Sequence, residues 1–302
     1  MRYLGRLDGL KRIVPPSVYY GGKWYQSPFI VPFVKGGRIY VEPCFGMGNV
    51  FFAKEPHPIE VINDIDGEIV NVFRCLQDFD TFRVLAHRLA WTPYSLDEFI
   101  KALSILEKGG DSIDRAWARI VVGNFSMNGI VRDRGRLVTA GYWSKVLSRD
   151  VCSKLRRRIP MLRLWHDRLT RVQIDNRDFL EVIKYWDTSD TVFYIDPPYP
   201  VDVRKKGREY VYSFEMSKEK HEEMVKVILQ CKGRVVLSGY YTTLYKPLEE
   251  RGWKVFRFPS VCCAAYRARK EKAKEKGKKV NRKRLECLWV NRLPSDGVVG
   301  KE

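Results

Sequence analysis

An aspartate, two prolines and a tyrosine follow an apolar run in the stretch TVFYIDPPYP, residues 191–200. The apolar run is typical of a buried strand. Proline fixes its own φ angle and cannot donate to a sheet ladder, so the strand must end at Asp196. In an open α/β sheet, ligands bind at the carboxyl ends of the strands. The sequence therefore predicts a rigid acidic corner at the edge of an active site, formed by Asp196, Pro197, Pro198 and Tyr199.

A glycine-containing turn follows another expected strand in YVEPCFGMGNVFF, residues 40–52. Gly46 and Gly48 lack a Cβ, so their backbone can approach a ligand closely. Pro43 ends the strand and leaves Glu42 beside the turn. A complete G-x-G-x-x-G fingerprint is missing, which favours a ligand without a pyrophosphate.

Asp64 stands 18 residues after Gly46, in the stretch EVINDID. An acidic residue at the end of the second strand of such a unit accepts hydrogen bonds from ribose hydroxyls. The alternative role, capping of the helix that begins near Gly67, suits Asp66 better. We therefore assign Asp64 to ribose binding.

The elements that carry these motifs alternate between strand and helix. We expect strands at 38–42, 60–66, 171–175, 191–196, 233–240, 253–258 and 285–290, and helices at 67–79, 177–186, 217–231 and 242–252. This pattern predicts an α/β fold with a doubly wound, mostly parallel, Rossmann-like sheet. Helical periods dominate from 85 to 168, for example at 96–106. We therefore expect a discontinuous catalytic domain, 1–84 and 169–302, with a helical target-recognition insert, 85–168.

The charge of the chain predicts a polyanionic partner. Its 302 residues include 55 Lys and Arg against 36 Asp and Glu, a formal net charge of +19, and 11 of the basic residues lie within 266–284. Such an excess favours binding to nucleic acid.

The remaining composition narrows the class of protein further. The seven cysteines are odd in number and form no C-x-x-C motif, which favours a reducing cytoplasm over a disulfide or zinc framework. We expect no metal site, and we expect the four histidines at surface or helix-cap positions. No apolar stretch is long enough to predict a membrane span.

Six segments occur in an order that resembles the DNA adenine methylase family, with its alpha-type order of motifs. They are YYGGKW, VEPCFGMG, NDID, NRDF, DPPY and ECLWVN. The resemblance covers residues 18–84 and 170–292 and, more loosely, the insert. It implies a site-specific methyltransferase that moves a methyl group from S-adenosylmethionine to the exocyclic N6 of adenine in double-stranded DNA. The chain departs from the family at Cys44-Phe45, where a Phe and then a small residue are common.

The resemblance implies a role for each matching position. The amino-acid end of the cofactor meets Tyr20, Gly22 and Lys23, and the pocket wall contains Glu42, Pro43, Gly46 and Gly48. Asp64 takes the ribose, while Asp178 and Phe179 border the cofactor's adenine. The target base is held by Asp196, Pro197, Pro198 and Tyr199. The stretch 123–137 resembles the family's DNA-reading turn, with Met127, Asn128 and Arg132 as the DNA contacts.

The chemistry explains why the corner needs these residues. The lone pair of the adenine amino group is delocalised into the ring, and two hydrogen-bond acceptors on that group restore its nucleophilicity. Asp196 and the Pro197 carbonyl can supply them, and a charged acceptor makes the stronger bond. The base must first be flipped out of the duplex. Tyr199 offers it an aromatic face, and the basic stretches 154–169 and 266–284 are expected to contact phosphates.

Three alternatives stay open from the residues. Enzymes that methylate N4 of cytosine use the same corner, often with Ser in place of the aspartate. A methyltransferase for RNA or protein is a second alternative. A catalytically silent nucleic-acid-binding protein is a third, although Asp196 and the glycine turn are both retained. The resemblance further implies a monomer in a prokaryotic or viral cytoplasmic setting, and a cognate restriction endonuclease where the enzyme serves restriction-modification.

Overall fold

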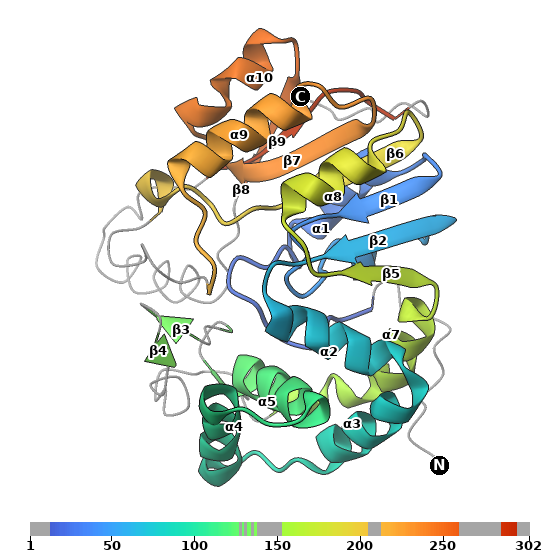
Figure 1. Ribbon diagram of the computed structural model, residues 1–302, viewed down its shortest axis with the longest axis vertical. Helices are drawn as coiled ribbons and strands as arrows, with labels where there is room; N and C mark the ends of the chain where they lie inside the picture. The colour runs from blue at the N-terminus through green and yellow to red at the C-terminus, as the bar shows by residue number, and fades with distance from the viewer. Residues whose placement is uncertain are drawn as a thin grey trace, which may run out of the picture.

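Apolar strands form a seven-stranded sheet in the order β5-β2-β1-β6-β7-β9-β8 (Figure 1). The computed structural model describes residues 13–126, 129, 132–133, 136–137, 153–204, 213–259 and 285–294. The strands, in chain order, are β1 (Ile39–Glu42), β2 (Ile59–Asn63), β5 (Val172–Asp175), β6 (Thr191–Ile195), β7 (Arg234–Tyr240), β8 (Lys254–Pro259) and β9 (Leu285–Val290). A separate antiparallel pair consists of β3 (Arg132–Asp133) and β4 (Arg136–Leu137).

Strand directions confirm a mostly parallel α/β sheet. Strands β5, β2, β1, β6 and β7 pair in parallel, whereas β9 is antiparallel to both β7 and β8. The carboxyl ends of the parallel strands therefore meet at one edge, and β9 begins at that same edge.

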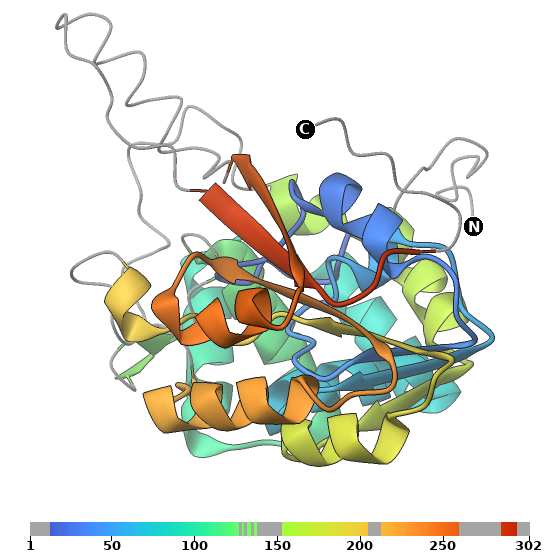
Figure 2. The same ribbon diagram turned by 90° about the horizontal axis from the view of Figure 1, so that it is seen from above.

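Helices cover both faces of the sheet. One face packs on α8 (Phe179–Trp186), α9 (Lys218–Ile228) and α10 (Lys246–Glu250). The other face packs on α1 (Ser27–Ile30), α2 (Gly67–Gln77), α3 (Phe79–Trp91), α4 (Leu96–Lys108), α5 (Ser112–Phe125), α6 (Ser153–Arg156) and α7 (Leu162–Leu169). Figure 2 shows α8 and α9 on the opposite side of the sheet from α1. This arrangement is the doubly wound architecture that the alternating pattern predicts.

The helices between 85 and 168 share a core with the sheet. Trp117 of α5 and Trp165 of α7 belong to the same buried cluster as Tyr40 of β1. Helix α3 runs across the expected boundary at residue 84. The division of the chain into a catalytic domain and a recognition insert stays a prediction.

Local signals position the helices near the site. Asp66 caps α2 by accepting a bond from the Glu68 N–H at 3.0 Å, which confirms its expected role. Ser217 caps α9 in the same way. The expectation for the histidines is wrong for two of the four: His166 and His221 are buried, the first against the Leu76 carbonyl and the second against the Tyr245 hydroxyl. Within the described ranges, no helix has the length and apolar character that a bilayer crossing requires.

Candidate active site

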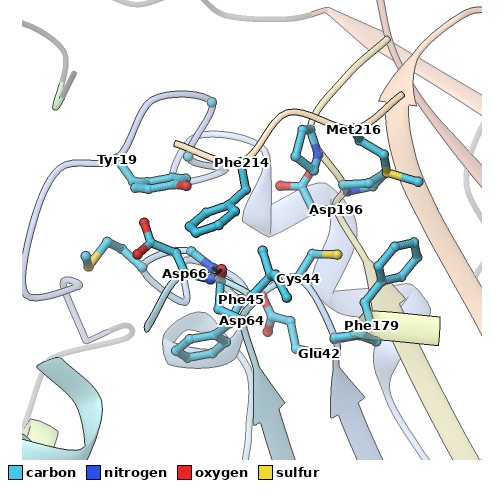
Figure 3. A pocket seen from close by; sticks show the side chains of 18 of the residues that line it. Tyr19, Glu42, Cys44, Phe45, Asp64, Asp66, Phe179, Asp196, Phe214 and Met216 are labelled. Carbon is cyan, nitrogen blue, oxygen red and sulfur yellow. Dashed lines mark hydrogen bonds between the residues drawn. The ribbon is translucent and has the colours of Figure 1, made fainter. Parts of the chain in front are cut away.

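A cavity of about 360 Å³ lies at the carboxyl ends of β1, β2 and β6 (Figure 3). It brings together nearly all of the residues that the motifs predict for cofactor and base. Those that line it are Tyr20, Gly22, Lys23, Glu42, Pro43, Gly46, Asp64, Asp178, Phe179, Asp196, Pro197 and Pro198. Gly48 and Tyr199 are not among the lining residues.

The glycine turn after β1 needs both of its glycines. Gly46 and Gly48 have φ angles of 54° and 69°, in the left-handed region that L-residues avoid. A Cβ on Gly48 would lie 2.5 Å from Cζ of Phe45, and one on Gly46 would lie 3.2 Å from the Tyr19 ring. Gly48 therefore shapes the turn, while Gly46 forms part of the wall.

Asp64 is fixed by the turn that it supports. Its Oδ2 accepts a bond from the Gly46 N–H at 2.8 Å, and its Oδ1 accepts one from the Asp66 N–H at 2.9 Å. Burial raises the pKa of Asp64 to about 6, although these two N–H groups work in the opposite direction. The carboxylate is thus held rigidly at the cavity wall, with lone pairs left for further donors.

Glu42 contributes a second buried acid at the end of β1. The Tyr40 hydroxyl donates to its Oε2 at 2.8 Å. Burial raises the pKa of Glu42 to about 8. Burial thus favours the protonated form of this side chain well above the pH at which a glutamate in water loses its proton.

The opposite wall comes from the start of α8. Asp178 caps this helix, accepting a bond from the Leu180 N–H at 2.8 Å, and pairs with Lys220 at 3.0 Å. Phe179 presents an apolar ring from the same turn, with the Lys220 ammonium 5.7 Å from its centroid. This wall is suited to a flat, partly polar group.

The acidic corner follows β6, and Lys23 binds it directly. The Lys23 Nζ lies 2.7 Å from both Asp196 oxygens, and Ser238 donates to Asp196 Oδ1 at 2.9 Å. The side chains of Lys23 and Asp196 are 4% and 20% exposed, respectively. Burial alone lowers the pKa of Lys23, but the carboxylates of Asp196 and Glu286 outweigh it and raise that pKa overall. The sequence places Lys23 only at the cofactor's amino-acid end; its ion pair with Asp196 was not predicted.

Tyr199 lies beneath the corner. Its side chain is 6% exposed, and its hydroxyl donates to Glu286. Its ring meets that of Tyr240 edge-on at 4.8 Å, and the Lys23 ammonium lies 4.7 Å from its centroid. This environment favours a packing role, and the expected stacking on a base stays a prediction.

Several lining residues were missed by the sequence reasoning. Tyr19, Phe214, Met216 and Lys220 all line the cavity. Phe214 is half exposed, and its ring projects toward the cavity (Figure 3). The stretch SFEMSKEK predicts only the start of α9. The one signal for the lining residues was the pair of apolar side chains, Phe214 and Met216, just before the Ser217 cap.

The predicted DNA contacts are only partly within the described chain. Met127, Asn128 and the segment 266–284 lie outside the described residues, and Arg132 is described only as backbone in β3. Arg156 and Arg157 are exposed. Arg158 instead donates to the Pro15 carbonyl at 2.9 Å, so it supports the fold.

The described residues contain no group of three or more His, Cys, Asp or Glu side chains that could hold a metal ion.

Comparison with known proteins finds one family model that matches the first part of the described chain. Residues 19–116 match the model for the D12 class of N6 adenine-specific DNA methyltransferases. No curated protein matches the chain. The matched segment contains the Gly-Gly-Lys turn, the β1 glycine turn and Asp64, which form one side of the cavity. The other side, the Asp196 corner, comes from residues beyond the match. This similarity, over residues 19–116, supports methylation of adenine N6 in DNA as the activity of the chain.

Proposed function

We propose that the cavity binds S-adenosylmethionine and that Asp196 receives an adenine flipped out of double-stranded DNA. The observation that carries this proposal is the meeting, in one cavity, of the glycine turn with Asp64 and the Asp-Pro-Pro corner. The first part suits a nucleoside ligand, and the second suits an amino group. A methyltransferase needs its cofactor and its target amino group side by side in one cavity.

The residues present fit the cofactor. A volume of about 360 Å³ is within the range of small-ligand sites. Asp64 offers half-buried carboxylate oxygens to ribose hydroxyls, and the lack of a Cβ at Gly46 leaves the wall open to a ligand. Phe179 and Asp178 suit the cofactor's adenine. When bound, S-adenosylmethionine supplies an electrophilic methyl group on a positively charged sulfur.

Asp196 and the proline corner prepare the nucleophile. The carboxylate accepts one N–H of the target amino group, and the Pro197 carbonyl accepts the other. Because positive charge grows on the nitrogen during transfer, an acceptor already in place stabilises the transition state. Lys23 and Ser238 hold the carboxylate in this position. The methylated amino group then loses a proton readily, so Asp196 need not be a strong base.

The target adenine has to leave the duplex to reach this corner. Flipping costs a few kcal/mol in lost pairing and stacking. We assign recognition to the region 85–168. Met127 is the apolar wedge, while Asn128 and Arg132 read bases or phosphates, since Arg paired with guanine is the commonest specific major-groove contact.

The proposal includes a monomeric enzyme in a reducing cytoplasm. The described part of the chain supports the redox setting through free thiols at Cys44, Cys75, Cys231 and Cys287. A cognate restriction endonuclease is the additional partner where the enzyme serves restriction-modification.

Sequencing of methylated DNA tests the function. The protein is incubated with S-adenosylmethionine and unmethylated genomic DNA, and modified bases are mapped. We expect N6-methyladenine within one short sequence. Methyl groups on cytosine N4, or none on DNA, would overturn the proposal.

Binding of S-adenosylhomocysteine, measured by calorimetry, tests the cofactor site. We expect binding to the intact protein and a loss of at least tenfold in the Asp64→Ala variant. Equal affinity of the two proteins would place the cofactor elsewhere.

A further inference from the structure

Strand β9 brings an unassigned acid to the active edge. Because β9 is antiparallel to β7, its first residues lie where β7 ends, and Glu286 pairs with Tyr240. The Glu286 side chain is only 2% exposed. A carboxylate so deeply buried requires partners that offset the loss of hydration.

Those partners are two residues of the site. The Lys23 Nζ lies 3.7 Å from Glu286 Oε1, and the Tyr199 hydroxyl donates to the same oxygen. Glu286 thus contacts both the lysine that binds Asp196 and the last residue of the Asp-Pro-Pro-Tyr corner. It does not itself line the cavity.

Lys23 depends on this second acid. It is buried, and one carboxylate at 2.7 Å competes with the cost of desolvating its ammonium group. The charged or titratable groups around it are Asp196 after β6, Glu286 on β9, Tyr240 on β7 and the Tyr199 ring, and its remaining hydrogen bond is to the Gly21 carbonyl at 3.1 Å. Burial raises the pKa of Glu286, while Lys23 and Tyr199 act to lower it.

We propose that Glu286 is a positioning residue for methyl transfer, which holds the Lys23 ammonium against Asp196 and anchors the corner through Tyr199. This inference rests on the proposed role of Asp196. Through Lys23, Glu286 fixes the direction in which the Asp196 carboxylate faces the target amino group. Through Tyr199, it fixes the peptide units that carry the second acceptor.

Replacement of Glu286 by glutamine tests the effect of its charge separately from its size. Glu286→Gln keeps the size of the side chain and an acceptor for Tyr199, but it removes one of the two charges that face Lys23. We expect kcat to fall by about 10- to 100-fold, as for a small displacement of a reacting group. The affinity for S-adenosylhomocysteine should fall much less than kcat, because Glu286 lies outside the cavity and Lys23 is only one of the residues that line it. The alkaline limb of the pH-rate profile should move to lower pH, because Lys23 loses a carboxylate that keeps it protonated.

Two further variants make the test specific. Tyr199→Phe removes only the hydroxyl and should lower kcat in the same direction. In a Lys23→Met background, Glu286→Gln should cause little additional loss, since residues that act through one another are not additive. Glu249→Gln is the matched control: Glu249 also contacts β9, through the Trp289 indole at 3.3 Å, but lies away from the corner. We expect it to leave kcat and the pH profile unchanged.

A measurement without turnover separates this inference from the proposed function. The melting temperature of the cofactor-free protein is followed from about pH 8 to about pH 11. Stability contributed by protonated Lys23 is lost as the pH rises through its folded-state pKa, so Glu286→Gln should begin to lose stability at lower pH than the wild type. Unchanged melting and pH-rate profiles in Glu286→Gln would overturn the role of Glu286. Absence of methyl transfer by the wild type would overturn the function and leave the melting comparison valid.

Discussion

At the scale of single residues, the site depends on charged side chains that are largely shielded from water. Lys23 is buried and Asp196 is only partly exposed. The ion pair between them therefore replaces contacts with water that each charge has lost. Removing one partner of such a pair leaves an uncompensated charge, which costs more than the pair contributes. Variants at this corner must therefore be chosen to separate chemistry from stability.

Asp196→Asn tests the chemistry. The amide keeps the shape and one acceptor, but it lacks the negative charge that stabilises the transition state. We expect a fall in kcat on the order of 100- to 1000-fold, with DNA affinity unchanged in a gel-shift assay. Asp196→Ala should lose as much activity and also lower the melting temperature, because Lys23 keeps only Glu286. Near-normal turnover of Asp196→Asn would contradict the mechanism.

Asp64 predicts a pH dependence of cofactor binding. With a pKa of about 6, it loses its charge as the pH falls through 6, and S-adenosylhomocysteine affinity should drop by about tenfold between pH 7 and pH 5. Stability should change in the opposite sense. Because the folded-state pKa exceeds the usual 3.8, the stabilising contribution is complete below that value and is lost as the pH rises through 6.

Calorimetry across this range checks both signs. Asp64→Asn should bind weakly at every pH and show no acid limb. An acid limb retained in Asp64→Asn would assign the titration to another group.

At the scale of elements, the site is a meeting of strand ends. Strands β1, β2 and β6 run in parallel, so Glu42, Asp64 and Asp196 arrive at one edge although more than 150 residues separate the first from the last. The turns after these strands determine which atoms face the cavity. A change in one turn should therefore alter the cavity without altering the core.

The turn after β1 predicts that a methyl group added at Gly46 weakens cofactor binding. Gly46→Ala forces an L-residue into a left-handed conformation, at about 1–2 kcal/mol, and places its Cβ 3.2 Å from the Tyr19 ring. We expect weaker S-adenosylhomocysteine binding by at least tenfold. Gly252→Ala is the control, since Gly252 has a similar φ of 83° with no atom within 4 Å of the added carbon. It should cost stability alone, and an equal loss of binding in both variants would contradict the crowding argument.

Elements were easier to predict than their arrangement. The strand at 191–195 ends at the Pro-Pro pair, and α2 begins after Asp66, because proline and capping chemistry act over a few residues. The order β7-β9-β8 and the direction of β9 depend on contacts between distant segments. Glu286 was therefore visible only as part of a strand and of the segment ECLWVN, without a role, and the Lys23–Asp196 pair only as two separate motifs. Helix α3 was missed because the expected helix 67–79 ran into its first turn.

At the scale of the whole molecule, the sequence concentrates positive charge in one segment whose flanking strands end at the active edge. Residues 266–284 hold 11 basic and two acidic residues, so they carry +9 of the net +19. The strands that flank this part of the chain pair at Pro259 and Leu285, on the edge where Glu286 lies. This basic segment is thus attached to the sheet at the edge where the Asp196 corner lies.

This attachment predicts the salt dependence of DNA binding. Replacing the 11 basic residues of 266–284 by Ser and Gln at constant length should make the plot of log K against log salt shallower. The slope should fall by about 0.9 for each DNA phosphate that this segment no longer neutralises. The rate of methyl transfer at saturating DNA should hold. Lys35→Gln with Arg38→Gln, exposed at the opposite edge of the sheet, is the control. An unchanged slope in the first variant would remove this segment from the DNA interface.

The position of β9 also has a consequence for the order of folding. It lies between β7 and β8, both of which the ribosome delivers earlier, so these two strands cannot pair with each other in the finished sheet. The edges of β7 and β8 that pair with β9 therefore stay unpaired until residues 285–290 have left the ribosome. Completion of the sheet and placement of Glu286 beside Lys23 are then a single late event.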